Sequence, residues 1–426
     1  MRVLSTVALL GLLGWSPMPL QAQSLKQTIN DLFVFGDCGQ PLCLSVGTGH
    51  GSHFIPAITQ GTNTVIGFLE TSIARTVAAT PISSTSSGVT YTLVGGLPVP
   101  SSSSPGPIFA ERAQTLGKGR FFLGGYVTGL NFTSLNGNPL DDITFNFGHQ
   151  DVDPDTTYGV PDFENDHIAV NMALELNSTS FYLNATWGIL DFVDVGVAVP
   201  FVRTSMNGTA TAQIMPFGNN TVHNFGGDPA NPIMRSTTAV SGTASGIGDV
   251  VGRLKINLGQ SKKFGAALLG EARFPTGNED DLLGAGFSSI RTMAVGSAQF
   301  GDFAPHLNVG YLFRSSNEVN DAVWTAIGFD HRMTDWATVA ADLLGSWQVG
   351  ETKQTLPGDL VYTTPIDRRI PSTSIPNRSE DLLNLSLGMK FRVRGGAILV
   401  ANIMTPLKKS GMQPDFIWTG GIEGAF

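Results

Sequence analysis

The chain ends in Asp415-Phe416-Ile417-Trp418-Thr419-Gly420-Gly421-Ile422-Glu423-Gly424-Ala425-Phe426, a stretch in which polarity alternates from one residue to the next. Every second position counting back from the terminus is apolar or glycine, and the large members of this row are Phe416, Trp418, Ile422 and Phe426. Thr419 and Glu423 fall in the other row. Because successive side chains of a strand point to opposite faces, this period of two predicts a β-strand that runs to the last residue. Such a strand suits the closing position of a β-barrel, although the edge of an open sheet would carry the same pattern.

The same period recurs along most of the chain from about residue 120 onward. In 168–176, for example, the aliphatic row Ile168, Val170, Met172, Leu174 and Leu176 alternates with polar Asn171 and Glu175. A tilted membrane-spanning strand needs ~9–11 residues, and most of the segments reach that length. We count about fourteen, near 120–133, 141–149, 165–177, 179–189, 191–205, 244–258, 263–274, 290–300, 303–314, 321–332, 335–348, 381–393, 396–405 and 415–426. Without the weakest, 141–149, and with two neighbours merged, the number is twelve.

The connections between these segments alternate in length. Gly301-Asp302 and Met333-Thr334 are tight joins, whereas 206–243 and 349–380 are long. Short turns at one rim and long loops at the other are typical of antiparallel barrels that cross an outer membrane. We therefore predict an all-β fold, a transmembrane antiparallel barrel of about fourteen strands. A soluble barrel or sandwich with its apolar rows inward is the competing interpretation, and it would leave a wide cavity to fill.

Charged residues on the strands indicate which face meets lipid. A Lys or Arg facing the middle of a bilayer would cost roughly 2–4 kcal/mol, so the charged rows are expected to face a wet lumen and the aliphatic rows the lipid. The predicted lumen-facing residues are Asp249, Arg253, Lys255, Glu271, Arg273, Lys390, Arg392 and Glu423. They would pair across neighbouring strands, or set a field that selects permeants.

The first part of the chain has a different character. Residues 1–22 read as a signal peptide, with Arg2 before a short apolar core and a plausible cleavage site at Leu20-Gln21-Ala22. Residues 23–117 are irregular and interrupted by serine-rich breaks, and they are predicted to form a plug-like or periplasmic segment before a barrel at 118–426. Cys38 and Cys43 are the chain's two cysteines, and in an exported protein a local disulfide is favoured over a metal pair.

Other chemistry finds little support in the sequence. The formal net charge of −9 argues against nucleic acid, and neither a G-x-S-x-G nor an H-E-x-x-H motif is present. Gly246, Gly248 and Gly252 suggest a dinucleotide loop only superficially, since no helix is predicted after them. His50 and His53 could be metal ligands, but a glycine-rich polar loop is favoured, and no metal or cofactor is expected. The run Glu279-Asp280-Asp281 could bind cations or lipopolysaccharide, although a solvated turn is favoured.

Several stretches resemble a known family of outer-membrane barrels. They are 194–201 (DVGVAVPF), 245–250 (SGIGDV) with Arg253-Leu254-Lys255, and 271–280 (EARFPTGNED). They are similar to barrels linked to the meta-pathway of phenol degradation, which are relatives of the long-chain fatty acid and aromatic-hydrocarbon transporters. The terminal Phe426 also resembles the signal read by the barrel assembly machinery. The resemblance implies a barrel surrounded by outer-membrane lipid and lipopolysaccharide, with an N-terminal plug and a small hydrophobic permeant.

We therefore expect a non-enzymatic outer-membrane channel for passive uptake of small hydrophobic compounds, either aromatic or fatty-acid-like. A general or weakly anion-selective porin is the alternative, motivated by the mixed lumen charges. A lipid-modifying enzyme of the outer membrane is a third hypothesis, and it has no nucleophile motif behind it.

Overall fold

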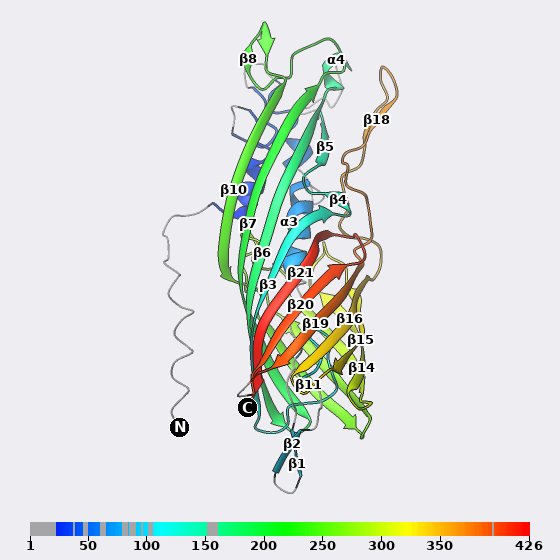
Figure 1. The fold of residues 1–426 in the computed structure, drawn as a ribbon. Helices are drawn as coiled ribbons and strands as arrows, with labels where there is room; N and C mark the ends of the chain where they lie inside the picture. The colour runs from blue at the N-terminus through cyan, green and yellow to red at the C-terminus, as the bar shows by residue number, and fades with distance from the viewer. Residues whose placement is uncertain are drawn as a thin grey trace, which may run out of the picture.

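A computed structural model describes residues 23–36, 39–45, 50–59, 65–78, 84, 91–94, 97–100, 105–150, 161–393 and 396–426. In this part of the chain, twelve antiparallel strands form a closed ring (Figure 1). In ring order they are β3 (Phe121–Leu135), β6 (His167–Leu190), β7 (Val193–Met215), β11 (Val251–Gln260), β12 (Phe264–Arg273), β13 (Ser289–Ala298), β14 (Phe303–Arg314), β15 (Ala322–Arg332), β16 (Ala337–Gln348), β19 (Leu382–Arg392), β20 (Ile398–Pro406) and β21 (Met412–Ala425). The predicted all-β barrel is confirmed.

The strand count is lower than fourteen for two reasons. The segments predicted at 165–177 and 179–189 are one continuous strand, β6, and the segment predicted at 141–149 is β5 (Ile143–Gly148), which pairs with β6 outside the ring. The expected loop at 206–243 is also shorter than predicted. Its ends belong to β7 and to β10 (Arg235–Ile247), which pair over thirteen residues.

Tight turns join the ring strands at one rim. Phe300 and Phe303 exchange backbone hydrogen bonds of 2.8 and 3.2 Å across Gly301-Asp302, between β13 and β14. Gly301 has a φ of 63°, which a residue without a Cβ adopts at no steric cost. The opposite rim carries the longer connections, with small hairpins β8 (Gly227–Asp228) with β9 (Asn231–Pro232) and β17 (Leu360–Tyr362) with β18 (Arg368–Ile370). β4 (Asn138–Pro139) pairs with the end of β3.

Part of the sheet extends beyond the rim that carries the long connections. It consists of β5, β10 and the adjoining residues 167–179 of β6 and 203–215 of β7, and we call it the extension. Figure 1 shows β5, β6, β7 and β10 reaching well past the neighbouring strands. Along the edge of β7, β10 and β11 lie end to end and are separated by 248–250. Only β11 continues the ring, through its pairing with β12.

The two faces of β6 exchange polarity part of the way along the strand. In the ring half of β6 the outward side chains are apolar and exposed: Phe181, Leu183, Trp187 and Ile189. In the extension the outward side chains are polar: Asn171, Glu175, Asn177 and Thr179. The inward side chains change in the opposite sense, from Ile168, Val170, Met172, Leu174 and Leu176 to Ser178, Ser180, Asn184 and Thr186. The prediction that the row 168–176 faces lipid is therefore wrong. The period is correct, but in the extension the apolar row is the buried one.

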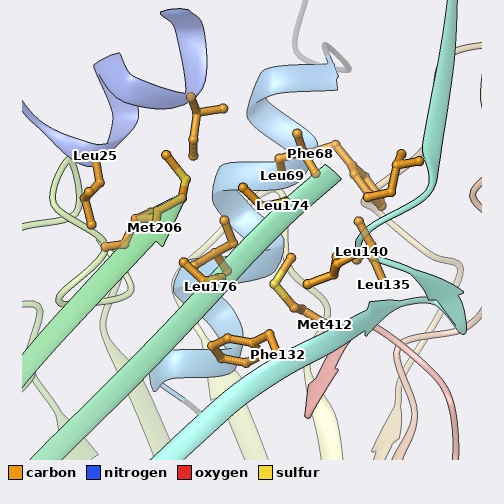
Figure 2. Packing of buried hydrophobic residues seen from close by; sticks show 14 of the residues in the cluster. Leu25, Phe68, Leu69, Phe132, Leu135, Leu140, Leu174, Leu176, Met206 and Met412 are labelled. Carbon is orange, nitrogen blue, oxygen red and sulfur yellow. The ribbon is translucent and has the colours of Figure 1, made fainter. Parts of the chain in front are cut away.

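The N-terminal helices fill the concave side of the extension. They are α1 (Leu25–Asp31), α2 (Pro56–Thr59) and α3 (Val65–Ala78), and the side chain of Ser24 caps α1 by accepting a 3.2 Å hydrogen bond from Gln27 N. Figure 2 shows Leu174, Leu176 and Met206 on the face of the sheet that meets these helices. Gly208 lets α1 approach closely, because a Cβ there would lie 2.9 Å from Leu32. Burial of this apolar surface holds the helices in place.

Described parts of the N-terminal segment lie at both ends of the barrel. α3 lies among the strands, while the hairpin of β1 (Tyr91–Val94) and β2 (Leu97–Pro100) lies at the short-turn end (Figure 1). Ser84 N donates a 2.8 Å hydrogen bond to Ile108 O, so these two parts of the segment lie side by side. The small helix α4 (Pro161–Glu164) lies near the tip of the extension. None of the described helices is long and apolar enough to cross a membrane.

Candidate lumen site

Residues 105–116, which we call the arch, occupy the lumen and are bound by side chains of the ring strands. Asn308 of β14 contacts both backbone groups of Glu111, accepting from its N–H at 2.7 Å and donating to its carbonyl at 2.9 Å. Ser297 Oγ accepts from Ala113 N at 3.1 Å, and Asn257 donates to Ala113 O at 2.7 Å. The arch forms no ladder with the ring, so these polar side chains satisfy its buried backbone groups.

Ion pairs fix the arch to the wall. Lys255 Nζ of β11 lies 2.9 Å from Glu111 Oε2, and both side chains are buried. Arg112 Nε donates to Asp330 Oδ1 at 3.0 Å, and its Nη2 contacts the second carboxylate oxygen. Both members of each pair have low exposure, so loss of one partner would leave an uncompensated buried charge.

The eight residues predicted to face the lumen are distributed over several contacts. Lys255 pairs with Glu111, Lys390 lies 2.9 Å from Glu423, and Glu271 Oε2 accepts from both Arg253 (3.1 Å) and Arg291 (2.9 Å). Asp249 lies at the break between β10 and β11, where its carboxylate accepts from Gly277 N and Ala285 N at 3.1 and 2.9 Å. Arg273 and Arg392 occupy inward positions on β12 and β19 and are partly buried.

A pocket remains between the arch, α3 and the ring wall at the long-loop rim. It encloses about 950 Å³, counting the space that opens to solvent. Its apolar lining comes from several strands and from the arch: Phe109, Phe287, Leu312, Trp324, Leu344 and Leu382. Its charged lining comprises Arg75, Glu271, Arg273, Arg291 and Arg314.

The arginines of this pocket differ in how they are neutralised. Arg75 of α3 lies 2.6 Å from Glu380, and Arg291 shares Glu271 with Arg253 and stacks 4.5 Å above the Trp324 ring. Within the described residues, neither Arg273 nor Arg314 forms an ion pair. The pocket therefore combines apolar walls with an excess of positive charge, which suits a hydrophobic molecule that carries an anionic group.

The closing strand joins the start of the barrel. β21 pairs with β3 from Met412 opposite Leu135 to Ala425 opposite Phe122, and Phe121 and Phe426 exchange backbone hydrogen bonds of 3.0 and 2.7 Å. The outward row is exposed (Phe416, Trp418, Ile422 and Phe426), whereas Thr419 and Glu423 are 4% and 3% exposed. The Glu423 carboxylate accepts from Tyr126 OH and Lys390.

Other predicted sites lie away from the lumen. Cys43 is buried, and Cys38 and residues 1–22 lie outside the described residues, so the disulfide and the signal peptide stay predictions. Gly246 belongs to β10 and Gly252 to β11, and a strand follows them rather than a helix. In the acidic run, the backbone carbonyl of Asp280 accepts a 2.8 Å hydrogen bond from Lys26 N of α1, which ties the loop to the N-terminal segment.

Glu111, Arg112, Asn308 and Asp330 are functional candidates that no motif in the sequence marks. Asn308 and Asp330 lie on strands that were predicted, but a single polar residue in an inward row does not indicate what it binds. Glu111 and Arg112 stand beside each other just before the barrel, and two adjacent charges in an irregular segment usually indicate solvent exposure.

A closed antiparallel ring with exposed apolar rows on its outer face and polar side chains on its inner face defines a transmembrane β-barrel. The chain belongs to the family described as "Putative MetA-pathway of phenol degradation", whose model matches residues 148–406.

Solved structures with a similar outline have low sequence identity. An outer-membrane channel from Pseudomonas putida F1 is 12% identical with a TM-score of 0.41, over 74% of this chain and 98% of that one. A Pseudomonas aeruginosa FadL homologue is 10% identical with a TM-score of 0.32, over 72% and 90%. A deletion mutant of the TodX monoaromatic hydrocarbon channel is 9% identical with a TM-score of 0.32, over 74% and 91%. The search of curated proteins found no match.

Proposed function

We propose that this protein is an outer-membrane channel for passive uptake of small hydrophobic compounds, aromatic or fatty-acid-like, that carry an anionic group. The observation that carries the proposal is the pocket at the long-loop rim, where apolar side chains surround arginines in excess of carboxylates. An acyl or aromatic body would contact Phe109, Leu312 and Leu344. Its carboxylate would bind Arg273 or Arg314, because guanidinium groups bind carboxylates in a bidentate geometry.

The exposed outer belt supports a location in a bilayer. Along β6 the outward side chains change from apolar to polar as the strand enters the extension, as expected of a strand that leaves the hydrocarbon region. The extension would then lie on the side of the long loops. The barrel assembly machinery and lipopolysaccharide stay predicted partners.

We infer that the arch obstructs the lumen beyond the pocket, because side chains of β11, β13, β14 and β15 hold it there. Passage to the short-turn side therefore requires the arch to shift, which breaks its contacts with Asn308, Lys255 and Asp330 and reforms them afterwards. A plugged channel of this kind is expected to carry little steady ionic current.

Uptake into proteoliposomes tests the proposal. Purified protein should admit an aromatic carboxylate such as 2-naphthoate faster than a neutral sugar of similar size, and equal or reversed rates would contradict it. The double variant Arg273→Gln/Arg314→Gln should slow naphthoate entry. As a matched control, Arg369→Gln removes a guanidinium from the exposed β17–β18 hairpin and should leave the rate unchanged.

The positive charge of the pocket also favours a second candidate, an anion-selective porin. The two functions differ in conductance, since a porin would show large steady currents of small anions in planar bilayers. Steady anion current with the arch intact would favour the porin.

A further inference from the structure

Four histidines from distant parts of the sequence meet beneath the tip of the extension. His50 and His53 lie between α1 and α2, His149 follows β5, and His223 lies between β7 and β8. His53, His149 and His223 are buried, and His50 is partly buried. The glycine-rich stretch around His50 and His53 predicts a polar loop, and no local spacing in the sequence places His149 and His223 beside it.

Three ring nitrogens converge on one point. The ligand atoms of His50, His53 and His149 all lie within 4.8 Å of one another. His53 Nδ1 lies 2.7 Å from His149 Nε2 and 3.3 Å from His50 Nδ1. For comparison, two nitrogens bound tetrahedrally at a zinc–nitrogen distance of 2.0–2.1 Å are roughly 3.4 Å apart.

Hydrogen bonding alone accounts poorly for this arrangement. A ring nitrogen carries either one hydrogen or one lone pair, so His53 Nδ1 can form one good hydrogen bond and not two. A metal ion accepts the lone pairs of all three nitrogens at once. The 3.3 Å separation matches that of two nitrogens on one zinc ion, and the 2.7 Å contact, a hydrogen bond without metal, would lengthen to about 3.4 Å once both nitrogens bind it.

His223 lies beside this group of three. Its ring lies 5.0 Å from that of His149 and 5.6 Å from that of His50, measured between centroids. Its Nδ1 lies 2.8 Å from Asp166 Oδ2, so Nε2 is the atom through which it would bind a metal. A carboxylate that holds the far nitrogen of a histidine is the usual outer shell of a metal site.

The surroundings suit an imidazole-rich metal centre. Asp166 is itself fixed, since its Oδ1 accepts a 2.7 Å hydrogen bond from Phe217 N. Phe54 packs edge-on against His149 and His223, with centroid distances of 5.6 and 5.1 Å, and provides an apolar wall. Imidazole ligands favour zinc, copper and nickel, whereas magnesium and calcium require oxygen ligands.

We propose that His50, His53 and His149 bind one divalent transition-metal ion, Zn²⁺ in the first instance, with His223 as the fourth ligand. Asp166 orients His223 and is a positioning residue. The ion would join the N-terminal segment, which supplies His50 and His53, to the connections at the tip of the extension, which supply His149 and His223. This site is distinct from the lumen pocket and does not depend on the proposed transport function.

Metal titration of the purified full-length protein tests the site. After chelation and dialysis, the protein should bind one Zn²⁺ per chain in competition with a chromophoric chelator. His149→Gln and His53→Gln should each weaken binding at least tenfold, and Asp166→Asn by about 10–100-fold. His331→Gln, on β15 of the ring and outside the cluster, is the matched control and should leave Zn²⁺ affinity unchanged.

A second measurement reports the ligand set directly. Co²⁺ bound in place of Zn²⁺ should give the intense visible absorption of a four-coordinate site, and His50→Gln should change that spectrum. His50 is less buried than the others, so this variant provides the test if a buried substitution prevents folding. Absence of stoichiometric binding, or equal affinity in the control and the cluster variants, would overturn the proposal.

Discussion

The side-chain amide of Asn308 pairs with the backbone of Glu111 as a neighbouring strand would, with one hydrogen bond accepted and one donated. This relationship explains how an irregular segment can lie buried in a barrel. The ring strands supply side chains that replace the missing ladder, and Asn308 is fully buried in doing so.

Asn308→Ala should loosen the arch. The substitution leaves the N–H and C=O of Glu111 without their partners, which should lower the free energy of unfolding by about 1–3 kcal/mol. Planar-bilayer recordings should also show more frequent or larger openings than the unmodified protein. Ser180→Ala is the control, because Ser180 Oγ is buried without a hydrogen-bond partner among the described residues. An unchanged current in Asn308→Ala would show that the arch does not limit conduction.

Arg112→Met should lower the free energy of unfolding more than a double substitution that removes both charges of the ion pair. The single variant leaves the Asp330 carboxylate buried without the Arg112 guanidinium. Breaking a buried pair in this way typically lowers the free energy of unfolding by about 3–5 kcal/mol. Arg112→Met/Asp330→Leu should recover much of that loss, because no isolated charge remains. Urea unfolding of both variants, in the same detergent, gives the comparison. A double variant that loses as much free energy of unfolding as Arg112→Met, or more, would show that the unpaired charge of Asp330 is not the cause of the loss.

The strand β6 shows how far sequence patterns lead and where they stop. Its period of two predicts the strand and its spacing correctly. The period alone does not say which face is buried, and that depends on whether lipid or a packed helix lies beside the strand. For this reason the pattern predicts that Ile168 and Leu174 face lipid. The polar residues Asn171 and Glu175 on the opposite, outward face show instead that this part of the sheet faces water.

The candidate sites were less predictable than the fold. Inward charges such as Lys255 and Glu271 follow from the alternation, but the partner of Lys255 comes from the arch, 144 residues away. In the histidine cluster, His149 lies 96 residues from His53. No local spacing encodes such contacts. They arise because the N-terminal segment folds back into a barrel that is built from later residues.

Leu176→Ala tests the inverted face of β6. Leu176 is fully buried against the N-terminal helices, so a loss of about 2–5 kcal/mol is expected from the cavity and the lost burial. Asn177→Ala, the adjacent outward position, should change the free energy of unfolding by less than about 0.5 kcal/mol. Equal effects of the two substitutions, measured by denaturant titration, would contradict the assignment of the faces.

Glu70→Gln should stabilise the protein at neutral pH. Burial raises the pKa of the Glu70 carboxyl above 4.5, against the opposing attraction of Lys26, which lies 3.4 Å away. Glu70 Oε1 is also buried without a hydrogen-bond partner in the described part of the chain. The folded state thus holds its proton more tightly than the unfolded state. The contribution of Glu70 to stability is present below about pH 4.5 and is lost as the pH rises through the folded-state pKa.

The free energy of unfolding, measured from pH 4 to pH 8, should increase for Glu70→Gln relative to the unmodified protein as the pH increases. Gln27→Glu, on an exposed position of α1, changes charge in the same region without burial and should not reproduce this trend. If the difference between Glu70→Gln and the unmodified protein were constant with pH, the carboxyl would not be titrating in this range.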